Sequence, residues 1–230
     1  MSRRSYHNQN AQAQSRNRGL TKGADGHRAV GRRGIWNSDG VPFSPPEDWY
    51  EPTGRSGFVV VSQDAGEGYR HVVTEEQIRE RLAELPAHML EDLEVVQLSR
   101  MTRKKQTLPC YGMQWGCALY LYPVEATLVE LFFAPPRPAF VTETRMYGGR
   151  WQQLNPTHWQ LLWTESAICD YYLNNILIHE LGHLLDDRNT NCTDRERYAE
   201  WFALEHGYKA SRAKMAEVAK KRVRRRHHSS

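Results

Sequence analysis

A single apolar run, Tyr171–Leu185, constrains the fold of this 230-residue chain more than any other segment. The run is apolar on most of its helical faces, yet residues 179–183 within it read His-Glu-Leu-Gly-His. A helix of this kind is buried in a core rather than laid on a surface. We therefore expect one long helix from Ser166 to about Asp187, with Thr164 or Ser166 as its N-cap.

The two histidines of this run are spaced for joint metal binding. His179 and His183 lie four residues apart, so a helix presents both of them on one face. Two imidazoles at that spacing can coordinate one Zn²⁺ at about 2.0–2.1 Å. Glu180 can take a proton from a zinc-bound water whose pKa has fallen to about 7. The apolar flanks argue against a chance occurrence of this pattern, so we predict a zinc site with Glu180 as general base.

A zinc site of this type needs a third protein ligand. Asp186 shares the stripe of the histidines, but it lies seven residues beyond His179, a rise of about 10.5 Å that is too long for one ion. We expect Asp186 to support the site from outside the ligand set or to close the end of the helix. A second helix, capped by Thr193 or Asp194, follows the loop 188–193 and offers a better placed carboxylate.

The start of this second helix resembles a known family. With the preceding His-Glu-Leu-Gly-His, the sequence Glu-Arg-Tyr-Ala-Glu-Trp-Phe-Ala at 196–203 is similar to small gluzincin zinc metallopeptidases of the ImmA/IrrE-like group. The resemblance covers about residues 166–204. It implies that Glu196 is the third ligand and that Glu200, one turn later, supports a metal histidine. The family has Asp or Asn at the second position, and only twelve residues separate His183 from Glu196, so Glu200 is the alternative third ligand.

Several other residues are weaker candidates for the site. His206 with the glycine after it resembles the third histidine of SprT-like proteases. An oxyanion-stabilising donor is also expected, and Tyr198, Tyr171 and His158 are candidates among which the sequence does not choose. Asn175 lies one turn before the first metal histidine, where a place at the edge of the core is the simpler interpretation.

The middle of the chain predicts an α+β fold, with a small antiparallel or mixed sheet packed on the long helix and the following Glu-bearing helix. Four segments are expected to form strands: 57–63, its returning partner 69–73, 93–99 and 117–122. A capping box of Thr74 and Gln77 opens a short helix between them. The resemblance implies a minimal zincin-like domain, in which 117–122 is our candidate for the edge strand that pairs with a substrate peptide.

Charge is distributed unevenly along the chain. Residues 1–40 hold eight Lys or Arg against two Asp, and residues 209–230 hold nine against one Glu. Since the whole chain carries +4, residues 41–208 carry −10. We predict a disordered basic tail over 1–44, a folded domain over 45–208, and beyond it a second basic tail that frays into solvent.

Nothing in the sequence places the chain in a membrane. The N-terminus is polar and lacks the apolar core of a signal peptide, and no apolar run approaches the length of a membrane span. The four cysteines form no Cys-x-x-Cys pair. We therefore expect a cytoplasmic protein with reduced thiols. The basic tails are suited to binding nucleic acid or another polyanion without base specificity.

Two functions from different classes follow from these residues. The first is zinc-dependent hydrolysis of a peptide or protein substrate, with Zn²⁺ held by His179, His183 and Glu196. The second is a non-catalytic, zinc-stabilised binding or regulatory module that associates with nucleic acid through its tails. The two functions differ at Glu180, because its replacement by Gln would abolish turnover and leave the metal bound.

Overall fold

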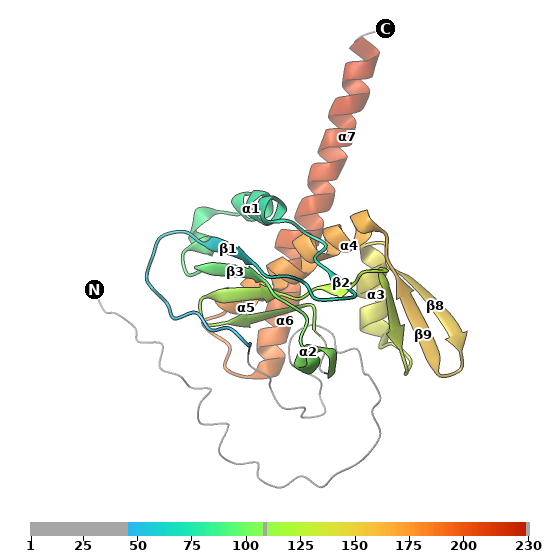
Figure 1. The fold of residues 1–230 in the computed structure, drawn as a ribbon. Helices are drawn as coiled ribbons and strands as arrows, with labels where there is room; N and C mark the ends of the chain where they lie inside the picture. The colour runs from blue at the N-terminus through green and yellow to red at the C-terminus, as the bar shows by residue number, and fades with distance from the viewer. Residues whose placement is uncertain (1–45, 108–109, 229–230) are drawn as a thin grey trace, which may run out of the picture.

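The computed structural model describes residues 46–107 and 110–228, so the basic tail predicted at 1–44 lies outside the described residues. The described part has an α+β fold of small mixed sheets and helices, as expected from the sequence (Figure 1). Within these ranges no helix combines the length and the apolar character needed to cross a membrane.

The main sheet has four strands in the order β1-β3-β5-β4. Its strands β1 (Val59–Ser62), β3 (Val95–Leu98) and β5 (Ala118–Leu121) run parallel, and β4 (Gly112–Trp115) pairs antiparallel with β5 at one edge. Every residue of β3 and β5 is buried. Continuous burial is expected of inner strands that are covered on both faces.

Different segments cover the two faces of this sheet. On one face, Leu119 and Leu121 belong to a core that also contains Ile78 of helix α1 (Glu75–Ala83) and Ile176 of the long helix. On the other face, Tyr120 packs against Tyr50 and its hydroxyl donates to the Asp48 carbonyl oxygen at 2.8 Å. The segment that precedes the first strand thus forms part of the fold.

One predicted pairing is wrong. The returning strand expected at 69–73 is only β2 (Tyr69–Arg70), and it pairs with β6 (Val124–Glu125) instead of with β1. β1 pairs in parallel with β3. The alternation of apolar and polar residues indicates an extended segment, but it is the same for either partner and therefore does not select the pairing.

A second sheet lies beside the first, in a part of the chain where the sequence predicted no strand. Its strands are β7 (Val129–Phe132), β9 (His158–Leu162) and β8 (Arg150–Asn155), all antiparallel. Helix α3 (Pro138–Met146) packs against it, since Trp151 donates from Nε1 to Thr144 Oγ1 at 2.9 Å (Figure 1).

Helix α1 (Glu75–Ala83) begins at the predicted capping box, in which Thr74 and Gln77 each bond the backbone of the other. Two shorter helical segments, η2 (Ala87–Leu90) and α2 (Arg103–Thr107), lie in the connections between strands.

The predicted long helix forms, with an irregularity in its middle. It consists of α4 (Glu165–Tyr171), the π-helical segment η3 (Tyr172–Ile176) and α5 (Leu177–Leu185). Thr164 caps it by accepting a hydrogen bond from the Ala167 N–H at 3.2 Å. Extra residues in a helical turn of this kind occur frequently at functional sites.

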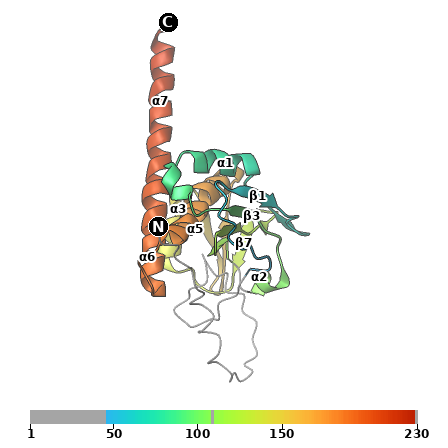
Figure 2. The ribbon, with the colours of Figure 1, turned by 90° about the vertical axis from the view of Figure 1, so that its left-hand side faces the viewer.

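The second predicted helix forms but begins earlier than expected. Asn191 caps α6 (Cys192–Phe202), whereas the sequence suggested Thr193 or Asp194. The chain continues without a break through the π-helical η4 (Ala203–Lys209) into α7 (Ala210–His228). The boundary placed at residue 208 therefore falls inside one continuous helical run, whose last part leaves the domain (Figures 1 and 2).

Candidate metal centre

Two histidines and a glutamate from neighbouring helices meet at one point. His179 and His183 lie one turn apart on α5, and Glu196 faces them from α6. The histidine Nε2 atoms are 3.1 Å apart, and the Glu196 carboxylate oxygens lie 3.2 Å from His183 Nε2 and 3.6 Å from His179 Nε2. Ligands of a tetrahedral zinc at about 2.0–2.1 Å stand roughly 3.3 Å from one another. These donor atoms have the spacing of three metal ligands.

One carboxylate oxygen of this cluster is buried without a hydrogen bond from the described residues, as expected of an atom that coordinates a cation. Glu196 Oε1 is buried and makes no hydrogen bond within the described part of the chain, although His183 Nε2 lies 3.2 Å away. Leaving a buried carboxylate oxygen without a hydrogen bond is unfavourable. A metal ion between the three side chains would coordinate this oxygen together with the two ring nitrogens.

The electrostatics of the cluster favour the ionised carboxylate. Burial by itself would raise the pKa of Glu196, but interactions with His179 and His183 outweigh burial and lower the pKa to about 2. Burial likewise opposes the charged form of His183, but Glu196 and Glu180 outweigh burial and raise the pKa of this histidine. An ionised carboxylate and two imidazole nitrogens that meet at one buried point are suited to a divalent cation.

A glycine lets α5 and α6 approach closely. A Cβ atom at Gly182 would lie 3.0 Å from Ala199 Cα and 3.1 Å from Phe202 Cβ, so only glycine fits without movement of α6. Across the same contact, Arg195 Nη2 donates to the His183 carbonyl oxygen at 3.1 Å. The interhelical distance that places Glu196 beside the histidines thus depends on these contacts.

The loop between the two helices is closed by side chains at both of its ends. Asp186 ends α5, and its Oδ1 accepts hydrogen bonds from the Asn189 backbone at 3.1 Å and from the Asn189 side chain at 3.0 Å. Asn191 Oδ1 then accepts from the Asp194 N–H at 2.9 Å and starts α6. The structure therefore places Asp186 at the helix end, one of the two positions expected from the sequence.

Glu180 is buried beside the metal cluster, with 1 % of its surface exposed. It packs against Gly112 of β4, where a Cβ atom would lie 2.8 Å from Glu180 Cγ and 2.7 Å from Ile176 Cγ2. Glycine is required here because strand and helix are in direct contact. The carboxylate expected to act as general base is thus confined between the metal helix and the edge strand.

The strand beside the metal helix is not the one expected from the sequence. The segment 117–122 contains β5, which pairs with β3 on one side and β4 on the other and therefore has no free edge. β4 is the terminal strand of the sheet, and within the described residues no further strand pairs with it. The prediction that 117–122 is the edge strand is wrong. The apolar sequence of β5 is typical of an interior strand, and Gly112 and Gln114 are residues that weaken the strand pattern of β4.

The two other candidates for the third ligand, Glu200 and His206, lie outside the cluster of ligand atoms. Glu200 is an exposed residue of α6, and the cluster found among the described residues contains Glu196 and not Glu200. His206 lies on η4 with its ring 4.4 Å from the ring of Phe202, outside the cluster.

The other candidate residues occupy varied positions. The Tyr171 hydroxyl donates to Glu143 Oε1 at 2.6 Å, and His158 contacts Asn155 on the second sheet, 2.9 Å from its Oδ1. Tyr198 lies on α6 under the guanidinium of Arg188. Asn175 is buried, and no hydrogen bond to its Oδ1 exists within the described part of the chain. Of these four, only His158 is of a residue type found in the cluster of ligand atoms, and it is not a member of that cluster.

Three residues that shape the site were not singled out in the sequence. Gly182 was visible inside the His-Glu-Leu-Gly-His motif, and the Asn191-x-x-Asp194 spacing is an N-cap pattern that could have been recognised. Gly112 carries no local signal, because its role arises from a contact with a helix more than sixty residues later.

Searches of protein-family models, of curated proteins and of solved structures find no match to this chain.

Proposed function

We propose that this protein is a zinc-dependent peptidase whose metal is held by His179, His183 and Glu196. The observation that supports the proposal is the convergence of these three donors, 3.1 to 3.6 Å apart, on one buried point. Bound zinc would supply a water of lowered pKa and a Lewis acid for the scissile carbonyl.

Within this proposal Glu180 is the proton carrier. It follows His179 directly, and it is buried, with its side chain packed against Gly112 of β4. A carboxylate held there accepts the proton of the attacking water and delivers it to the leaving amine. No other described carboxylate joins the two histidines and Glu196 in the cluster.

Strand β4 is the strand with which we propose that a substrate peptide pairs. It lies at the edge of the main sheet and contacts α5 through Gly112. An extended peptide that added to this edge would carry its backbone past Glu180 and would be held by main-chain hydrogen bonds. Such binding is largely independent of side-chain sequence, so specificity would come from the neighbouring pockets.

The donor set alone does not fix the metal, because two histidines and one carboxylate also suit non-haem iron(II). The buried glutamate next to the first histidine favours hydrolysis, since oxygen chemistry at iron has no need of a base in that position. Elemental mass spectrometry of the purified protein identifies the metal directly. We expect about one zinc per chain, and its loss in His183→Ala.

The decisive test of the reaction combines metal content with turnover in Glu180→Gln. The wild type should cleave members of a mixed peptide library, detected by mass spectrometry of new termini. Glu180→Gln should retain its zinc and lose cleavage by at least about a hundredfold, as expected for the loss of a general base. Zinc in both proteins with no cleavage by either would favour the non-catalytic zinc-stabilised module. Absence of metal in both would reject the metal centre.

A further inference from the structure

The C-terminal helix α7 leaves the domain and projects into solvent. It runs from Ala210 to His228, a length of about 28 Å. Figures 1 and 2 show it extending beyond the rest of the molecule in both views. Every residue from Ala213 to Lys221 is exposed. This stretch of the helix is therefore exposed to solvent, apart from the contact that Lys214 makes with Glu84.

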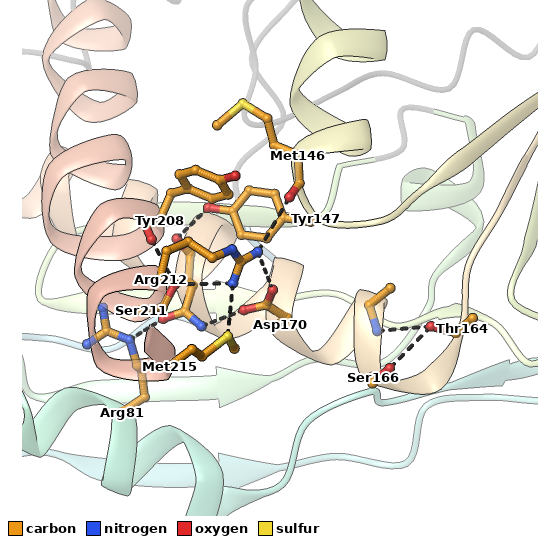
Figure 3. A network of polar contacts seen from close by, with 12 residues as sticks. Arg81, Met146, Tyr147, Thr164, Ser166, Asp170, Tyr208, Ser211, Arg212 and Met215 are labelled. Carbon is orange, nitrogen blue, oxygen red and sulfur yellow. Dashed lines mark hydrogen bonds and ion pairs between the residues drawn. The ribbon is translucent and has the colours of Figure 1, made fainter. Parts of the chain in front are cut away.

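The base of α7 is nevertheless firmly attached. Arg212 donates from Nη2 to Asp170 Oδ2 at 2.6 Å, and its guanidinium lies over the rings of Tyr147 and Tyr208 (Figure 3). Lys214 forms an ion pair with Glu84. Asp170 belongs to α4, which continues into the metal helix. The direction in which α7 projects is thus fixed relative to the candidate metal centre.

The projecting part of α7 is densely basic in sequence. Six of the seven residues at 220–226 are Lys or Arg, and Glu217, paired with Lys221 at 2.8 Å, is the last acidic residue of the chain. Seven helical residues span about 9 Å from first to last, which places one positive charge per roughly 1.5 Å. Duplex DNA carries one negative charge per about 1.7 Å of its axis. The two charge densities are closely matched.

Composition distinguishes among possible polyanions. After Ala219 the only large apolar residue is Val223, so the helix lacks the apolar face with which amphipathic helices enter a lipid surface. It also lacks Asn and Gln, the residues that pair bidentately with adenine, whereas Lys and Arg contact phosphates whatever the sequence. A helix with its side chains is about 10–12 Å across and fits the major groove of B-DNA, which is about 12 Å wide.

We propose that α7 is an arm that binds double-stranded nucleic acid through its phosphates, without sequence specificity. The cations of residues 220–226 neutralise phosphates, and the Arg212 and Lys214 contacts hold the arm in a fixed direction. The bound nucleic acid therefore lies at a set position relative to the metal centre. This inference is independent of peptidase activity, because it rests on charge and on the anchoring of the helix.

The experiment compares two full-length variants with the same net charge. In the arm variant, Lys220, Arg222, Arg224 and Arg225 are replaced by Gln, which preserves helix propensity and leaves the Glu217–Lys221 pair intact. In the control variant, four exposed arginines of the domain are replaced by Gln: Arg55, Arg100, Arg145 and Arg150. Binding of a fluorescent DNA duplex is measured by anisotropy over a range of salt concentrations.

We expect the wild type and the control variant to bind the duplex with a steep salt dependence. The arm variant should bind at least about tenfold more weakly at low salt, and its slope of log K against log salt should be shallower by about 3. Equal affinity of the arm variant and the wild type, or an equal loss in both variants, would overturn the proposal. So would failure of the wild type to bind the duplex. Tighter binding of the wild type to anionic lipid vesicles than to the duplex, lost in the arm variant, would reassign the arm to membranes.

Discussion

Gly207 of η4 lies directly against the backbone carbonyl of Asn174 in η3. A Cβ atom at Gly207 would stand 2.0 Å from the Asn174 carbonyl oxygen, closer than any contact that real side chains make. Tyr147 donates its hydroxyl to the same oxygen at 2.9 Å, and Arg81 donates to the Asn174 side chain. The two π-helical segments thus pack through a point that admits only glycine, five residues before the first metal histidine.

Gly207→Ala should therefore destabilise the protein. Ala in a helix is ordinarily about 1 kcal/mol better than Gly, but overpacking at this contact, at the upper end of about 1–3 kcal/mol, should leave a net loss of about 1–2 kcal/mol. Thermal unfolding should show a Tm lowered by about 2–8 °C. A Tm equal to or above that of the wild type would mean that the two segments do not touch in this way.

Gly182→Ala should push α6 away from α5 and weaken metal binding. The added methyl group meets the Ala199 backbone and Phe202, and the displacement carries Glu196 from the two histidines. We expect metal affinity, measured by competition with a chelator, to fall by about tenfold or more. Gly182→Val should be worse than Gly182→Ala. Unchanged metal affinity in both variants would mean that the contact of Gly182 with α6 does not control metal binding.

Glu196→Gln and Glu200→Gln form a matched pair one turn apart on α6. Glu196 lies 3.2 Å from His183 Nε2, whereas Glu200 is exposed outside the cluster. Glu196→Gln should lose the metal during purification, and Glu200→Gln should retain about one equivalent. The metal content of both variants is read by elemental mass spectrometry. The reverse result would make Glu200 the third ligand.

Glu130 should make stability depend on pH. It is buried, and burial raises its pKa to about 7, even though hydrogen bonds from Tyr111 and Trp163 act in the opposite direction. The folded state thus binds this proton more tightly than the unfolded state, whose pKa is 4.5. The resulting stability is fully present below pH 4.5 and is lost as the pH rises through about 7.

Glu130→Gln removes this titration while keeping the shape of the side chain. Denaturant unfolding at several pH values should show the variant gaining stability relative to the wild type as the pH rises from about 5 to 8, by up to roughly 3 kcal/mol. The Tyr111 hydroxyl can reverse to accept a hydrogen bond from the new amide. A difference between the two proteins that does not change with pH would contradict the assigned titration.

The elements that the sequence predicted well are those with local chemical signals. The apolar run around His179 predicted a buried helix, and the capping box of Thr74 and Gln77 predicted the start of α1, because both depend on residues within a few turns of one another. Glu196 was expected as third ligand only through a family resemblance, and the structure places it in the cluster with His179 and His183.

The features that were not predicted depend on distant contacts. The pairing of β2 with β6 joins residues about fifty-five positions apart, and the interior position of β5 depends on where β3 and β4 lie. Buried and exposed residues do not alternate along β8, so this strand of the second sheet lacks the two-residue period that predicts a strand. The attachment of the C-terminal helix to the domain was not predicted either, because charge predicts solvation but does not reveal the contacts of Arg212 with Asp170 and of Lys214 with Glu84.

The three donors of the metal cluster all come from residues 179–196, a helical hairpin closed by the short loop that begins at Asp186. Closing a short loop has a small entropic cost, so this hairpin can form early in folding. The parallel pairing of β1 with β3 requires closure of a much longer loop and is expected to form later. A metal ion captured by the hairpin would act during folding as well as afterwards. Zinc supply would then set how much of the newly made chain reaches the native state.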